Sequence, residues 1–177
     1  MRAWRSCRYT EVVDATPLLA EVARQLRDTR LEAVLIGNAA AALQGAPVTT
    51  VDFDFFFRKT PRNMAKLKAI ARGLDATVMR PYYPASELYR IVRDRDGLQV
   101  DFMGAIHGIR SFEGLRDRAS WIEIGGIALR VASLDDIIRS KRAAKRPRDR
   151  AVLEILEKAR EEAGKARRKA RPGPTRE

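Results

Sequence analysis

Residues 35–58, LIGNAAAALQGAPVTTVDFDFFFR, decide how this sequence folds. The stretch predicts a short apolar strand, a Gly-Asn turn, a helix of small residues, a loop containing proline, and a second strand that carries Asp52 and Asp54. Side chains alternate between the two faces of a strand, so these two carboxylates point to the same side. Val51, Phe53, Phe55 and Phe57 point to the other side, into a core.

Two neighbouring carboxylates on a strand that is otherwise apolar need a physical explanation. Like charges repel each other, and burial removes the water that would stabilise them. A bound cation relieves both effects, and ligands that are all oxygen suit Mg²⁺. The alternative is an edge strand with two solvated aspartates. Because strands are depleted in Asp, the sequence favours a metal site at Asp52 and Asp54.

The composition describes a globular chain with an excess of positive charge. The 177 residues are 45% hydrophobic and 33% charged, with a formal net charge of +12. This length predicts one domain with a helical extension. The charge favours polyanionic partners such as RNA or nucleotide phosphates, although a basic surface can also serve only solubility. One cysteine and one histidine exclude a disulfide framework and a Cys/His zinc cluster within one chain.

Hydrophobic periodicity and capping residues predict the remaining elements of an α/β fold, with a mixed sheet flanked by helices. Helices are expected over 16–29, 39–44 and 61–73, within 104–119, and from 133 and 147 onward. Strands are expected over 33–36, 50–57, 76–79, 88–93, 98–103, 121–124 and 127–131. We divide the chain into a core (1–132), a C-terminal helical segment packed on it (133–163), and a basic tail (164–177) that we expect to be frayed or disordered.

A third aspartate lies on a later predicted strand. Asp101 alternates with Val100 and Phe102, so it faces away from them. If this strand lies beside the strand at 50–57, Asp101 joins the first two aspartates, and three carboxylates can share one or two divalent ions. A solvated aspartate on an edge strand is an equal alternative.

Two further segments contain residues suited to binding phosphate. Gly37 and Asn38 form a turn between a strand and a helix, where free backbone N–H groups can meet an anion. Taken alone, such a turn is a weak signal. The predicted helix that begins after Ser133 carries Lys141 and Lys145, which are four residues apart and are expected on one helix face.

These features resemble the signature of the DNA polymerase β-like nucleotidyltransferase superfamily. The resemblance rests on Ile36-Gly37-Asn38 followed by Asp52-Phe53-Asp54-Phe55. The superfamily usually has Gly or Ser where this chain has Asn38. Residues 131–149 are similar to the C-terminal pattern of minimal nucleotidyltransferases, closest to the stand-alone toxins of abortive-infection type toxin–antitoxin systems. The resemblance covers residues 31–158.

The resemblance implies a polymerase β-like core and a specific reaction. The enzyme would move a nucleoside monophosphate from an NTP, such as ATP or CTP, to an acceptor hydroxyl. In the toxin subfamily this acceptor is the 3′ end of tRNA, and a cognate antitoxin protein is a partner. The implied cofactor is Mg²⁺, with Mn²⁺ as an alternative. The implied metal ligands are Asp52, Asp54 and Asp101. The implied catalytic residues are these three aspartates together with Lys141 and Asp149. The implied nucleotide-binding residues are Gly37, Asn38, Arg58, Lys141 and Lys145.

Other functions remain open from the sequence. The chain could transfer nucleotides to a protein or a small molecule, or be a catalytically idle RNA-binding or antitoxin module. It could also be an unrelated basic α/β RNA-binding protein. No apolar run approaches the length of about 20 residues that a membrane span needs, and no signal core is visible, so we expect a cytoplasmic protein.

Overall fold

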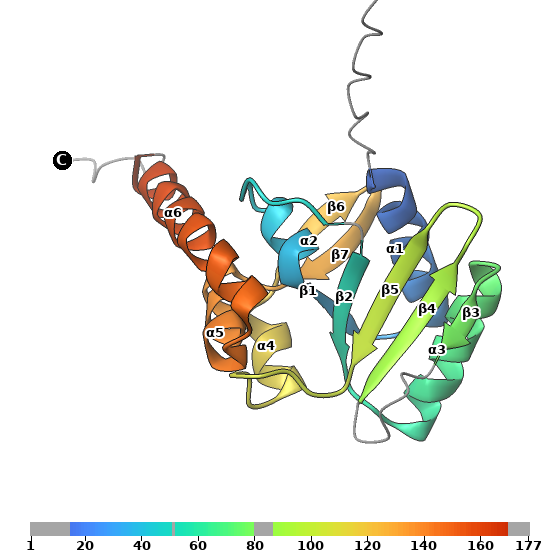
Figure 1. Ribbon diagram of the computed structural model, residues 1–177. Helices are drawn as coiled ribbons and strands as arrows, with labels where there is room; N and C mark the ends of the chain where they lie inside the picture. Colours follow the sequence, from blue (N-terminus) through green and yellow to red (C-terminus); the bar gives the residue numbers. More distant parts are fainter. Residues whose placement is uncertain (1–14, 51, 80–86, 170–177) are drawn as a thin grey trace, which may run out of the picture.

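A mixed β-sheet with helices on both faces forms the centre of the computed structural model (Figure 1). The structure describes residues 15–50, 52–79 and 87–169. Within them the sheet has seven strands in the order β3-β4-β5-β2-β1-β7-β6. The strands are β1 (Ala33–Ile36), β2 (Asp52–Phe57), β3 (Thr77–Met79), β4 (Leu88–Arg93), β5 (Leu98–Met103), β6 (Ser120–Ile124) and β7 (Ile127–Val131). The predicted fold class is therefore confirmed.

The pairing of the strands brings distant segments together. β1 pairs with β2 antiparallel and with β7 parallel, while β2 pairs with β5 parallel. The hairpins β4–β5 and β6–β7 extend the sheet on either side. The glycine of the first hairpin turn, Gly97, has φ +70°, a conformation that favours glycine.

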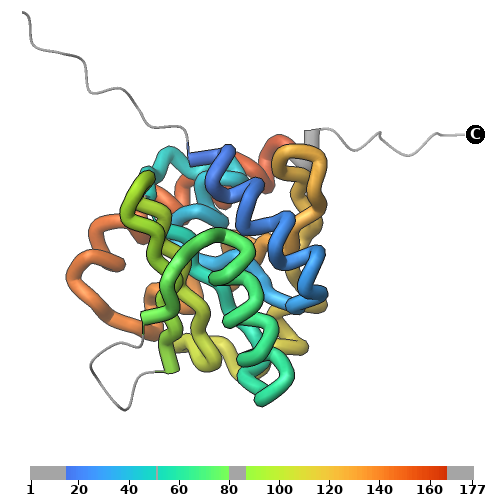
Figure 2. Tube along the Cα trace, turned by 90° about the vertical axis from the view of Figure 1, so that its right-hand side faces the viewer, coloured from blue at the N-terminus to red at the C-terminus, as the bar shows by residue number. Residues whose placement is uncertain are grey.

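The described part of the chain contains six helices. They are α1 (Thr16–Thr29), α2 (Gly37–Ala42), α3 (Pro61–Gly73), α4 (Phe112–Arg118), α5 (Leu134–Ala144) and α6 (Pro147–Lys169). α1 and α3 run side by side on one face (Figure 2). α2 lies against β1, β2 and α5, while α5 and α6 pack together and α6 projects away from the sheet (Figure 1). None of the helices is long and apolar enough to cross a membrane.

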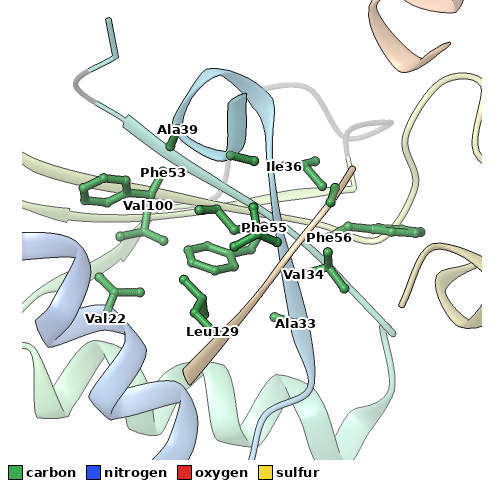
Figure 3. Close-up of a cluster of buried hydrophobic side chains, with 14 of the residues drawn as sticks. Val22, Ala33, Val34, Ile36, Ala39, Phe53, Phe55, Phe56, Val100 and Leu129 are labelled. Carbon is green, nitrogen blue, oxygen red and sulfur yellow. The ribbon is translucent and has the colours of Figure 1, made fainter. Parts of the chain in front are cut away.

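The phenylalanines of β2 anchor the core. Phe55 is fully buried and stacks on Phe102 of β5 with ring centroids 5.3 Å apart. Val22 of α1 and Leu129 of β7 approach the same cluster (Figure 3). Each such side chain contributes about 1.5–3 kcal/mol when it is fully buried. This packing fixes one face of β2, so its opposite face, with the aspartates, is fixed as well.

Three local expectations differ from the structure. α2 begins at Gly37 and ends at Ala42, two residues earlier at both ends than expected. α6 continues through Gly164 to Lys169, because the residues around that glycine form helices well and one glycine costs only about 1 kcal/mol relative to alanine. Lys145 is not on a helix face, because it ends α5 in the left-handed conformation with φ +53°. Residues 170–177 of the expected tail lie outside the described residues.

Candidate active site

Three carboxylates meet where β2 and β5 run side by side. The parallel register places Asp54 directly opposite Asp101, and Asp52 precedes Asp54 on the same face of β2. One oxygen from each of the three side chains lies within 4.8 Å of the others. The structure therefore satisfies the condition on which the sequence analysis depended, that these two strands are neighbours.

Two of the carboxylates are held by neighbouring side chains. Arg90 on β4 donates two hydrogen bonds of 2.8 Å, from Nε and Nη2, to the two oxygens of Asp101. Asp101 is only 5% exposed. The hydroxyl of Thr50 donates a hydrogen bond of 2.6 Å to Asp52 Oδ1. Neither Arg90 nor Thr50 was predicted from the sequence as a site residue.

Asp54 carries the clearest electrostatic signature of the cluster. Burial, followed by the charges of Asp52 and Asp101, raises the pKa of Asp54 from 3.8 to about 7. The cations Lys141 and Arg148 act in the opposite direction and lower it. Burial and two neighbouring carboxylates therefore both disfavour the charged form of Asp54, and a bound divalent cation would relieve both effects.

The turn at Gly37 lies against this cluster. Gly37 has φ +70°, and a Cβ atom on it would come within 2.4 Å of Asp54 Oδ2. Glycine is thus required here for both its backbone conformation and its lack of a side chain. In the next residue, the side-chain oxygen Oδ1 of Asn38 is buried and has no hydrogen-bond partner among the residues that the structure describes. A buried acceptor of this kind is costly unless a donor reaches it.

A buried ion pair joins the two C-terminal helices beside the carboxylates. Lys141 of α5 donates a hydrogen bond of 3.0 Å to Asp149 Oδ1 in the first turn of α6. The two side chains are 14% and 11% exposed. Lys141 lies close enough to the cluster for its charge to lower the pKa of Asp54.

A single cavity of about 660 Å³ connects these groups. Its lining includes seven of the predicted site residues: Gly37, Asn38, Asp52, Asp54, Asp101, Lys141 and Asp149. It also includes residues to which the sequence analysis gave no site role, namely Thr50, Arg90, His107, Ser140, Arg146 and Arg148. A volume of this size is typical of small-molecule and cofactor sites.

Two predicted nucleotide-binding residues do not line the cavity. Arg58 follows the last residue of β2, and the aspartates lie at the strand's beginning. Its guanidinium forms an ion pair with Glu113 and lies 5.8 Å from the ring centroid of Phe112. Lys145 is exposed at the end of α5, where its left-handed backbone turns the chain toward α6.

The donor set fits a hard divalent cation. The cluster offers carboxylate oxygens only, and the neighbouring Thr50 hydroxyl and Asn38 amide are also oxygen donors. Although both oxygens of Asp101 accept hydrogen bonds from Arg90, each carboxylate oxygen has a second lone pair. Oxygen ligands of this kind suit Mg²⁺, Mn²⁺ or Ca²⁺ better than softer metals.

Comparison with solved structures places the fold among nucleotidyltransferases. A candidate nucleotidyltransferase from Thermotoga maritima matches with a TM-score of 0.54 and 20% identity, covering 92% of this chain and 95% of the other. The antibiotic-resistance factor ANT(2″)-Ia, solved in complex with adenylyl-2″-tobramycin, gives 0.54 and 17%, with coverage of 88% and 98%. The lincosamide antibiotic adenylyltransferase LnuA, bound to lincomycin, gives 0.58 and 10%, with coverage of 80% and 95%.

Sequence comparisons assign the family. No curated protein sequence matches the chain. A family model described as "Nucleotidyl transferase of unknown function (DUF2204)" matches residues 15–171. Because this match spans every element from α1 to α6, the chain belongs to that family and is a nucleotidyltransferase.

Proposed function

We propose that this enzyme transfers a nucleoside monophosphate from an NTP to the 3′-terminal hydroxyl of a tRNA, and so acts as a translation-blocking toxin. The observation that carries the nucleotidyl transfer is the convergence of Asp52, Asp54 and Asp101 beside the Gly37 turn in one cavity. In the reaction, the acceptor oxygen forms a bond to the α-phosphorus of the NTP. The bond from the α-phosphorus to the bridging oxygen breaks, and pyrophosphate leaves.

The carboxylates divide into two roles in this proposal. Asp52 and Asp54 would hold Mg²⁺, which when bound neutralises and orients the triphosphate. Asp101 would accept the proton of the attacking hydroxyl, because Arg90 holds its carboxylate in a fixed orientation beside Asp54.

The remaining residues would handle the phosphates. Backbone N–H groups at Gly37 and Asn38 would donate to the β- and γ-phosphates, where the missing glycine side chain leaves room for a close approach. Lys141 would stabilise the charge that develops on the leaving pyrophosphate, and Asp149 would position it.

The acceptor is inferred from charge. A net charge of +12 suits a polyanionic acceptor, because Lys and Arg contacts to phosphate supply most of the sequence-independent affinity for nucleic acids. A cognate antitoxin protein would then be needed to restrain the activity in the cell. A protein acceptor would not require so basic a surface.

A small-molecule acceptor is the second candidate. Adenylyltransferases named for antibiotics share this fold over at least 95% of their own chains. The cavity wall beside the carboxylates is partly apolar, with Met103, Ile106, Ile109 and Val152 in its lining. Such a wall could accommodate the body of a small molecule that presents one hydroxyl.

Label transfer separates these acceptors. The purified protein is incubated with Mg²⁺, each labelled NTP in turn, and total tRNA, tobramycin or lincomycin. Label that moves onto tRNA supports the proposal and names the nucleotide, whereas label on an antibiotic supports the second candidate. The negative control is Asp54→Asn, and its matched variant is Asp28→Asn, an exposed aspartate of α1. Absence of transfer to every acceptor would contradict the proposed function.

A further inference from the structure

The cations that line the cavity fall into two groups. The first group is already bound to carboxylates. Arg90 is paired with Asp101, and Lys141 is paired with Asp149. The charge of each of these cations is therefore largely neutralised by its carboxylate partner, which it also holds in place.

The second group consists of Arg146 and Arg148. Both line the cavity, and both are exposed. Within the described residues, neither guanidinium has a hydrogen bond or an ion pair. By contrast, the two arginines of α5, Arg139 and Arg142, are paired with Asp136 and Glu157. The arginines at the cavity are thus available to a ligand.

The corner between α5 and α6 holds these two arginines in place. The left-handed residue Lys145 ends α5, and Pro147 begins α6 directly afterwards, which restricts the backbone on both sides of Arg146. Arg148 lies in the first turn of α6. The positive end of that helix adds to the local potential.

Arg148 shares its cavity with the carboxylate cluster. Arg148, Lys141 and Asp54 all contribute to the lining of this one space. A ligand that reaches the carboxylates can therefore also meet this guanidinium.

We propose that Arg146 and Arg148 form a second phosphate-binding site at the mouth of the cavity, separate from the turn at Gly37. Its ligand is a phosphate group with two accessible non-bridging oxygens, which a guanidinium binds through two parallel hydrogen bonds. The phosphate comes either from the triphosphate of the NTP or from the backbone of a polynucleotide acceptor. The inference rests on the proposed function only in taking nucleotides as ligands.

Equilibrium binding without turnover tests this site. The probes are an NTP analogue with a non-hydrolysable α–β bond in the presence of Mg²⁺, and labelled tRNA without NTP. The test variant is Arg146→Gln/Arg148→Gln. The matched control is Arg62→Gln/Arg72→Gln, which removes the same charge from exposed positions on α3, on the opposite side of the molecule from α6 (Figure 1). All variants are first compared by thermal unfolding, and exposed positions should leave the midpoint unchanged.

Either of two results supports the proposal and identifies the source of the phosphate. If the site binds the triphosphate, the dissociation constant of the NTP analogue rises about 10-fold or more in the test variant only. If it binds the acceptor backbone, tRNA affinity falls by a similar factor, and the slope of log affinity against log salt decreases by about 0.7 to 0.9 for each lost phosphate contact.

Equal binding of both probes by the test and control variants would overturn the proposal. This outcome is distinct from failure of the proposed function, because a protein that transfers no nucleotide can still bind phosphate at this corner. Conversely, an active enzyme can still lack the second site.

Discussion

Arg90 and Asp101 face each other across the β4–β5 pair, and two hydrogen bonds of 2.8 Å join their side chains. The side chain of Arg90 is 38% exposed, and that of Asp101 is 7% exposed. Arginine thus approaches from the solvent side and fixes a carboxylate that lies beside Asp54. Without this clamp, repulsion from the neighbouring aspartates would favour other rotamers of Asp101.

We expect Arg90→Gln to lower kcat with little change in KM for the NTP. The substitution leaves Asp101 in place but removes both charge-assisted hydrogen bonds. Loss of a residue that orients a carboxylate at a metal site typically costs on the order of 10- to 100-fold in activity. Arg90→Lys should recover only part of the loss, since an ammonium group cannot make the two parallel bonds.

The control for this prediction is Arg95→Gln. Arg95 lies in the same hairpin and pairs with Asp75, but both side chains are mostly exposed. Its loss should leave kcat within error. If Arg90→Gln were as active as Arg95→Gln, the orienting role of Arg90 would be wrong.

The sequence contained enough information to find Arg90. The strands over 88–93 and 98–103 were predicted with four residues between them. A hairpin closed by Arg93 and Leu98 places Arg90 opposite Asp101 when residues are counted back along both strands. The parallel pairing of β2 with β5, by contrast, could not be derived from the sequence alone. It joins segments more than forty residues apart, and its register depends on core packing such as the Phe55–Phe102 stack.

Gly37→Ala should abolish activity. An alanine Cβ would come within 2.4 Å of Asp54 Oδ2, and alanine also disfavours φ +70°. We expect a loss in kcat/KM on the order of 100-fold or more, since displacement of a reacting group by about 1 Å has that effect. Steady-state kinetics with the labelled NTP measures it.

Gly97→Ala is the matched control for this substitution. Gly97 has the same φ of +70°, but nothing lies within 4 Å of its Cβ position. It therefore carries the backbone cost, about 1 kcal/mol, without the clash. Similar kinetic losses in both variants would mean that backbone strain, and not contact with Asp54, accounts for the effect.

Asp54→Asn should stabilise the metal-free protein while removing its activity. The pKa of Asp54 is about 7 in the folded protein, against 3.8 when unperturbed. Between these values the folded state binds more protons than the unfolded state, so stability falls as pH rises through this window. Above pH 7 the cost is fully present, on the order of 2 to 4 kcal/mol, and asparagine avoids it.

Urea unfolding in EDTA at a series of pH values measures this difference. The gap in unfolding free energy between Asp54→Asn and the wild type should be near zero at pH 4 and reach its maximum above pH 7. Added Mg²⁺ should stabilise only the wild type. A gap that does not depend on pH would contradict the raised pKa of Asp54.

The C-terminal end of α5 could not be predicted from the sequence. The starts of α5 and α6 were predicted from Ser133 and Pro147, and Lys141 was selected through a family resemblance. The same reasoning placed Lys145 beside Lys141. That failed because the helical period stops at Ala144, and a basic run gives no signal of where a helix ends.

The Lys141–Asp149 pair should couple the two helices and support catalysis. It is nearly buried, so removing one partner leaves an uncompensated charge. In a double-mutant cycle of Lys141→Met and Asp149→Asn, we expect a coupling free energy of unfolding above about 1 kcal/mol. The pair Arg142–Glu157 also joins α5 to α6, but its side chains are more exposed, at 58% and 33%. Its cycle should give a coupling free energy below about 0.5 kcal/mol.

Lys141→Met should also lower kcat by about 100-fold, while Arg142→Met should not. Equal coupling in both cycles, with unchanged kcat, would mean that the buried pair is no more than an ordinary link between the helices.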